Sequence, residues 1–149
     1  MLICASCHCG NIAFALDWSP EPLEIPARAC ACTFCVKHGA VWTSCPSGSL
    51  RIRIANPTLA SRYAFATGTA DFHVCSRCGV VPLATSRIED RLFAVVNVNT
   101  FDDVDASPLR RSSSTLDGES GDVRLARRAR NWIGDVALVY GAADLSAAN

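Results

Sequence analysis

The chain has 149 residues, half of them hydrophobic and only 19% charged, so it can bury a core and is not globally disordered. Its 14 basic and 14 acidic side chains balance, which counts against a protein that binds nucleic acid or acidic membranes through net charge. No apolar run approaches the ~18 residues of a membrane span, and the first residues lack the features of a signal peptide. We therefore expect a single cytoplasmic domain over residues 1–149, with reduced cysteines and no nucleic-acid or membrane partner.

Short runs of alternating or apolar residues, separated by turn residues, predict a mainly β fold. Residues 11–18 alternate between large apolar side chains and small or polar ones, and two prolines then end the run. Gly68 favours a hairpin between the runs at 63–66 and 72–74. The run at 92–98 is almost continuously apolar, which is typical of a buried strand. The further predicted strands are, in chain order, 40–45, 50–54, 63–66, 72–74, 80–83 and 92–98.

The C-terminal part of the chain has a different composition. Residues 105–121 are polar and rich in serine and glycine, which predicts a long surface loop. Residues 122–133 are ambiguous, because Leu125, Ala129 and Trp132 have helical spacing while the residues around Leu125 also have a strand pattern. Residues 142–149 are expected to form a frayed tail. The sequence shows no internal repeat, and it does not indicate an oligomeric state.

Nine cysteines require an explanation other than disulfides, because their number is odd and the thiols are expected to be reduced. Close clusters separated by long gaps are typical of metal ligands, since a metal ion gathers short loops from distant parts of a chain. We therefore predict that most of these cysteines bind metal. Their positions are Cys4, Cys7, Cys9, Cys30, Cys32, Cys35, Cys45, Cys75 and Cys78.

Two of the clusters are pairs that end in glycine, in the stretches CHCG at 7–10 and CSRCG at 75–79. A metal-binding turn directs backbone N–H groups at the sulfur atoms, and glycine permits the positive φ that such a turn requires. Together the two pairs supply four thiolates, which suit a closed tetrahedral zinc site of the structural kind. The predicted ligands of this site are Cys7, Cys9, Cys75 and Cys78.

The remaining cluster consists of Cys30, Cys32 and Cys35, in the stretch CACTFC. Three protein ligands with an open fourth position are typical of catalytic zinc, where water or substrate completes the coordination shell. Two other interpretations fit the same spacing. Either Cys45 or His38 closes the site and makes it structural, or the cluster holds an iron–sulfur centre.

These motifs, in this order, resemble the glutathione-dependent formaldehyde-activating family of small zinc proteins. The resemblance covers nearly the whole chain, and the three cysteine motifs together are specific. The sequence departs from the usual family pattern at Thr33, where serine is common, and at Val36, where a basic residue is common. The matching stretches are CHCGNIAF at 7–14, CACTFCVKHGA at 30–40, FHVCSRCGV at 72–80, VNVNTFDD at 96–103 and ARNWI at 129–133.

The resemblance implies a β-tent (Mss4-like) fold of short antiparallel sheets held by a structural zinc, with two zinc ions per chain. It places the structural ion on Cys7, Cys9, Cys75 and Cys78, and a catalytic ion on Cys30, Cys32 and Cys35. It also implies that residues 122–125 are strand and not helix. The implied activity is that of a carbon–sulfur lyase, which reversibly joins glutathione and formaldehyde. The alternative is a non-catalytic zinc module with two structural sites that binds a protein or another ligand.

Several residues near the motifs are candidates for substrate contacts. Lys37, Arg77 and Arg87 have the charge to pair with glutathione carboxylates, although isolated surface charges are usually only solvated. His38 and His73 are candidates for proton transfer at neutral pH. The aromatic rings of Phe34 and Trp42 line either a pocket or the core. The arginines at 124, 127, 128 and 130 are expected to form a solvated face, and a weak contact with an anion is the alternative.

Overall fold

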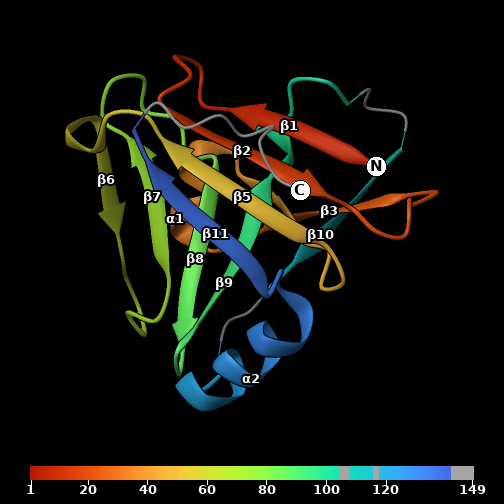
Figure 1. Cartoon of the computed structure of the whole chain (residues 1–149). Helices are drawn as coiled ribbons and strands as arrows, with labels where there is room; N and C mark the ends of the chain where they lie inside the picture. The colour runs from red at the N-terminus through yellow and green to blue at the C-terminus, as the bar shows by residue number, and fades with distance from the viewer. Residues whose placement is uncertain (105–107, 116–117, 142–149) are drawn as a thin grey trace.

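The computed structural model describes residues 1–104, 108–115 and 118–141, and in this part of the chain two β-sheets pack against each other (Figure 1). The first sheet has the strand order β1-β2-β5-β11, with β1 (Leu2–Ser6), β2 (Ile12–Asp17), β5 (Ser49–Ile54) and β11 (Asp135–Tyr140). The second has the order β10-β3-β4-β9-β8-β7-β6, with β10 (Leu109–Ser114), β3 (Ile25–Cys30), β4 (Val41–Thr43), β9 (Arg91–Asn97), β8 (Leu83–Ile88), β7 (Asp71–Cys75) and β6 (Ala60–Tyr63).

Two α-helices accompany the sheets within the described residues, α1 (Thr33–His38) and α2 (Gly121–Asn131), together with single 3₁₀ turns at Pro57–Leu59 and Val98–Thr100. Most strand pairs are antiparallel, but the edge strands β10 and β11 run parallel to β3 and β5. The predicted mainly β, Mss4-like fold is thereby confirmed. Of the described helices, none combines the length and the apolar character that a membrane-spanning helix requires.

The main core lies between the two sheets and explains the alternation in the sequence. Phe14 and Ile52 reach it from the four-stranded sheet, and Leu83 and Val96 reach it from the seven-stranded sheet. All four side chains are fully enclosed or nearly so, as the period of two in their strands requires. The intervening residue Val95 points to the opposite face of the seven-stranded sheet and joins a second, smaller cluster with Trp42 and Ala84.

Most of the predicted strands are confirmed. The runs at 11–18, 40–45, 50–54 and 92–98 correspond to β2, β4, β5 and β9. The expected hairpin is present as the antiparallel pair β6 and β7, with Gly68 in the connection at φ 65°, but its first strand is Ala60–Tyr63 and overlaps the predicted run at 63–66 only at Tyr63. The strand predicted at 80–83 is wrong except for its last residue, because β8 (Leu83–Ile88) begins only there. Pro82 has no N–H to donate to a ladder, and its carbonyl accepts a hydrogen bond from Asn97 N (2.8 Å).

The predicted surface loop at 105–121 is wrong for its central part. Residues Leu109–Ser114 form β10, which pairs in parallel with β3 at the edge of the larger sheet. The strand carries mostly exposed polar residues, and its Arg110 forms an ion pair with Glu24 (Nε–Oε1 2.6 Å). A polar edge strand lacks the alternation by which strands are recognised, which is why its composition resembles that of a loop.

The strand implied at 122–125 is also wrong, since these residues form the first turns of α2. Ser120 caps the helix by accepting a hydrogen bond from Val123 N (3.4 Å), and Asp122 lies in the first turn, where the helix dipole favours negative charge. The helix ends where Ile133 forms two backbone hydrogen bonds with Ala94 of β9 (2.9 and 3.0 Å). The tail predicted at 142–149 lies outside the described residues.

The enclosed ring of Phe14 provides a test of this packing. Phe14 has no exposed surface and packs edge-on against Phe101, with ring centroids 6.3 Å apart. Phe14→Ala leaves a cavity between the sheets, and we expect it to lower the free energy of unfolding by about 3–5 kcal/mol. Leu23→Ala is the control, because Leu23 is 97% exposed and its loss is expected to change stability by less than about 0.5 kcal/mol. Urea unfolding followed by circular dichroism measures both, and equal effects would contradict the assigned core.

Candidate functional site

Four cysteines from two distant parts of the chain lie close together. Cys7 and Cys9 lie in the turn between β1 and β2, while Cys75 ends β7 and Cys78 lies in the turn that follows. Their sulfur atoms all lie within 4.8 Å of one another, with Cys9–Cys75 at 3.5 Å and Cys7–Cys9 at 3.8 Å. A tetrahedron of Zn–S bonds of about 2.3 Å has edges of about 3.8 Å, so this donor set fits a zinc ion.

The two turns that carry these cysteines have the same backbone design. In each, the first cysteine donates its N–H to a carbonyl beyond the second cysteine, Cys7 to Ile12 (2.8 Å) and Cys75 to Val80 (2.9 Å). The glycine that follows each pair adopts positive φ, 75° at Gly10 and 77° at Gly79, which is the role predicted from the sequence. The Ile12 N–H also donates to the sulfur of Cys7 (3.3 Å) and so stabilises negative charge there.

The thiols of this cluster differ in acidity. Burial raises the pKa of Cys7 to about 12. The pKa of Cys78 falls to about 6 although burial opposes the shift, because the backbone N–H groups of Val80 and Cys9 and the neighbouring thiols donate to its sulfur. The backbone N–H groups thus favour the thiolate form of Cys78, and a cation bound by the four sulfurs would favour ionisation of the others.

The second cluster is assembled by the start of helix α1. Cys30 is the last residue of β3, Cys32 caps the helix, and Cys35 lies in its first turn, with all three sulfur atoms within 4.8 Å of one another. The Cys32 sulfur accepts a hydrogen bond from Cys35 N (3.4 Å). Trp42 donates its indole N–H to the Cys35 sulfur (3.2 Å), and Gly39 ends the helix at φ 67°. The neighbouring Cys30 thiol and burial both raise the pKa of Cys35.

Neither of the two candidate closing ligands belongs to this cluster. The Cys45 sulfur lies in the main core and contacts the Ser19 carbonyl (3.9 Å) and the Ser47 hydroxyl (3.5 Å). His38 uses Nδ1 to contact the carbonyl of Phe34 (2.7 Å). Among the Cys, His, Asp and Glu residues that the structure describes, only Cys30, Cys32 and Cys35 make up the group, so the chain supplies three metal-binding atoms there.

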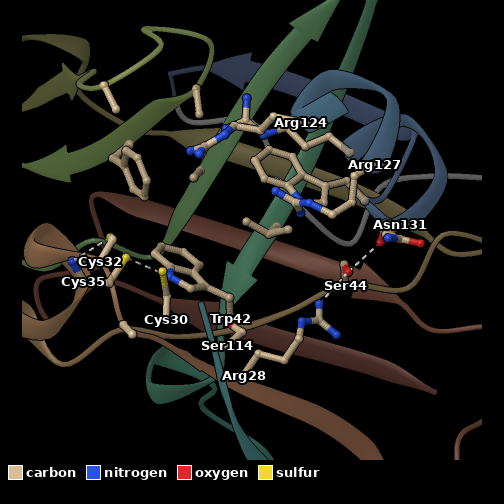
Figure 2. Close-up of a pocket in the computed structure, with 18 of the residues that line it drawn as sticks. Arg28, Cys30, Cys32, Cys35, Trp42, Ser44, Ser114, Arg124, Arg127 and Asn131 are labelled. Carbon is tan, nitrogen blue, oxygen red and sulfur yellow. Dashed lines mark hydrogen bonds between the residues drawn. The ribbon is translucent and has the colours of Figure 1, made fainter. Parts of the chain in front are cut away.

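The three-cysteine cluster opens into a pocket of about 660 Å³ on the outer face of the seven-stranded sheet. Figure 2 shows the cysteines at one side of this pocket, with Arg28, Arg124 and Arg127 across from them. The apolar surface between the two sides comes from residues of the smaller core cluster and from the C-terminal end of α2, namely Trp42, Phe72, Ala84, Val95 and Trp132.

Three arginines of α2 line this pocket, so the predicted solvated face is wrong for Arg124, Arg127 and Arg128. Only Arg130 is exposed as expected. Glu119 accepts three hydrogen bonds from Arg127, two from Nε (2.9 and 3.2 Å) and one from Nη2 (3.0 Å), and its carboxylate lies 3.8 Å from Arg124 Nε. The spacing of 124, 127 and 128 places these residues on one helix face, and this signal could have identified them once the segment was known to be helical.

The end of α2 is fixed to the sheet by a polar connection across the pocket wall. Arg28 Nη2 donates to the Ser44 hydroxyl (3.0 Å), and this hydroxyl donates to the backbone carbonyl of Asn131 (2.7 Å; Figure 2). Ser44 is buried, so both bonds are partly shielded from water. One serine therefore links β3 to the last turn of the helix that carries the arginines.

Other candidates from the sequence lie elsewhere. Lys37, Arg77 and Arg87 are exposed and do not line the pocket. Among the described lining residues there is no histidine. His73 is enclosed in β7, where Nε2 lies 2.9 Å from the Thr85 hydroxyl, and burial lowers its pKa to about 4. Trp42 lines the pocket, whereas the Phe34 ring packs against other aromatic side chains, Tyr63, Phe65 and Phe72.

Comparison with known proteins agrees with this arrangement. A family model described as glutathione-dependent formaldehyde-activating enzyme matches residues 2–114, which contain both cysteine clusters. A crystal structure of a Rhodobacter sphaeroides protein, a structural genomics target, is similar with a TM-score of 0.54 and 26% identity, over 70% of this chain and 92% of that one. No curated protein matches the chain. The family match ends before α2, so the stretch at 129–133 lies beyond it.

The connection through Ser44 makes a measurable contribution to stability. Ser44→Ala leaves the Asn131 carbonyl and one Arg28 N–H without this partner, and we expect the free energy of unfolding to fall by about 1–3 kcal/mol. Amide hydrogen exchange in the last turn of α2 should rise with it. Ser61→Ala, at an exposed position of β6, is the matched control. If both variants behave alike in unfolding and in exchange, the connection does not hold the helix.

Proposed function

The chain belongs to the glutathione-dependent formaldehyde-activating family, and from this we propose that it is a zinc-dependent carbon–sulfur lyase. The proposed reaction reversibly joins a small thiol, glutathione, to an aldehyde, formaldehyde. In the forward direction an S–C bond forms between the thiol sulfur and the carbonyl carbon. The π electron pair of the carbonyl moves to oxygen, which takes up the proton that the thiol releases, so the product is S-hydroxymethylglutathione.

One observation carries this proposal: three cysteine sulfurs are gathered at the edge of a pocket large enough for a small molecule. A purely structural site satisfies all its coordination positions with protein atoms, as the four-cysteine cluster is able to do. At the second cluster the described residues supply only three ligands, Cys30, Cys32 and Cys35, which is one fewer than a closed tetrahedral site requires. A ligand from the pocket is then needed to complete a tetrahedral shell.

We assign a structural zinc to Cys7, Cys9, Cys75 and Cys78, and a catalytic zinc to Cys30, Cys32 and Cys35. Four soft donors at tetrahedral spacing support the first assignment, and three donors beside a pocket support the second. When bound at the second cluster, zinc offers a fourth coordination position and strongly lowers the pKa of a thiol held there.

The chain's own residues prepare this second cluster for chemistry. The indole N–H of Trp42 points at the Cys35 sulfur and stabilises its thiolate form. The Cys32 sulfur is held by the backbone N–H of Cys35, so its position is fixed by the first turn of α1. The apolar side chains of Trp42 and Val95 lower the local polarity and so strengthen electrostatic interactions on their side of the pocket. A thiol bound here is positioned beside the aldehyde and does not depend on chance encounter.

Metal content tests the two assignments. We expect two zinc ions per chain, and X-ray absorption should show an average of one S₄ site and one site with three sulfurs and a light atom. Cys30→Ser should lower the content to one ion while circular dichroism stays unchanged, because Cys30 is partly exposed at a strand end. Cys4→Ser is the control and should keep both ions, since Cys4 belongs to neither cluster. Two S₄ sites would contradict the open site and favour a non-catalytic zinc module.

Exchange NMR between formaldehyde and glutathione tests the reaction itself. The zinc-loaded protein should speed the exchange between free glutathione and its adduct, and Cys30→Ser should abolish the increase. Cys4→Ser, with both clusters intact, should retain it. Removing zinc with a chelator should have the same effect as Cys30→Ser. An exchange rate that is the same with and without zinc-loaded protein would refute the lyase.

A further inference from the structure

The pocket next to the three-cysteine cluster has a strong excess of positive charge. Arg28 from β3 and Arg124, Arg127 and Arg128 from α2 all line it, and the described lining residues include no acidic side chain. The carboxylate of Glu119 lies beside Arg127 and Arg124 and balances one of these charges. Four guanidinium groups against one carboxylate leave an excess of three positive charges, and a zinc ion held by the three thiolates would reduce this excess only to two.

These guanidinium groups lie in surroundings that make their charge costly. Arg128 is only 6% exposed, and its Nη1 donates to the hydroxyls of Thr69 (2.7 Å) and Ser86 (3.2 Å) and to the Thr69 carbonyl. Its Nε is buried and has no hydrogen-bond partner in the structure. Burial lowers the pKa of Arg128 to about 10, and the nearby Arg124 and Arg127 act in the same direction.

Arg28 lies in similar surroundings. Burial lowers its pKa, and the charge of Arg127 lowers it further, so the two guanidinium groups repel each other. Cations that are desolvated and crowded destabilise a protein unless negative charge compensates them. A pocket that keeps such a group of arginines is therefore complementary to an anion.

We propose that α2 and Arg28 form an anion subsite that binds a carboxylate of the same molecule whose sulfur lies at Cys30, Cys32 and Cys35. This inference rests on the proposed function for the position of the sulfur, but the anion subsite itself rests on the arginines. Guanidinium groups bind carboxylates through paired N–H donors, which gives both affinity and orientation. The apolar surface of Trp42, Val95 and Trp132 between the two ends suits the carbon chain that joins thiol and carboxylate.

The subsite also explains a division within the chain. Both cysteine clusters lie inside residues 2–114, which match the family, whereas the arginines of α2 lie beyond that segment. The thiol chemistry is thus assigned to residues 2–114, which match the family. Recognition of the substrate's carboxylate is assigned mainly to α2, which follows that segment. The specificity for charged over uncharged thiols is therefore expected to depend on α2.

Ligand titrations with the zinc-loaded protein test the subsite. Trp42 and Trp132 both line the pocket, so their fluorescence should report binding. S-Methylglutathione has the carboxylates of glutathione but no free thiol, and 2-mercaptoethanol has a thiol but no carboxylate. We expect Arg124→Gln and Arg127→Gln each to weaken binding of S-methylglutathione about tenfold or more, and to change binding of 2-mercaptoethanol less than about twofold. Arg130→Gln, on the exposed face of the same helix, should change neither.

Glu119→Gln separates recognition from a merely structural role of the Glu119–Arg127 ion pair. If the arginines bind the anion, removing the competing carboxylate should leave the affinity for S-methylglutathione equal or higher. If Arg127→Gln acts only by breaking the ion pair, Glu119→Gln should weaken binding as much, and this result would overturn the subsite. Unchanged affinity in both arginine variants would also overturn it.

The thiol-free probe keeps the two proposals separate. Weakened binding of S-methylglutathione in the arginine variants supports the subsite even when the protein does not speed formaldehyde exchange. Faster exchange together with unaltered S-methylglutathione binding in those variants supports the lyase and refutes the subsite.

Discussion

Strand β9 is buried on both faces, and this constraint determines where the rest of the molecule is placed. Ala94 and Val96 pack into the core between the sheets, whereas Val95 packs on the outer face. One short strand thus forms the centre of the fold and part of the pocket floor. Because Ala94 also exchanges backbone hydrogen bonds with Ile133, the same strand fixes the point at which α2 ends.

Features that depend on neighbouring residues could be predicted from the sequence. The alternation at 11–18 and at 50–54 predicted strands because half-buried strands repeat every two residues. The cysteine clusters were divided correctly into a set of four and a set of three, because a turn that carries metal ligands requires close spacing and a glycine. The metal ligands themselves remain a prediction, although the structure gathers the sulfur atoms as expected.

Features that depend on distant partners could not be predicted. Strand β10 is polar, and only its pairing with β3 makes it a strand. Residues 122–125 at the start of α2 were implied to be a strand by the family resemblance, although the family match does not extend to them. The arginines of α2 were expected on a solvated face. Their position in the pocket follows from tertiary contacts, such as those of Arg128 with Thr69 and Ser86, that no local pattern encodes.

The attachment of α2 to the middle of the larger sheet has a consequence for how the protein is made. A chain is synthesised from its N-terminus, and the four-cysteine cluster, β8 and β9 all precede α2 in the sequence. Ile133 must emerge before it can pair with Ala94, and β11 must follow before it joins β5 at the edge of the other sheet. The wall that carries the arginines is consequently among the last parts of the structure to be assembled, and until then the three-cysteine cluster is without it.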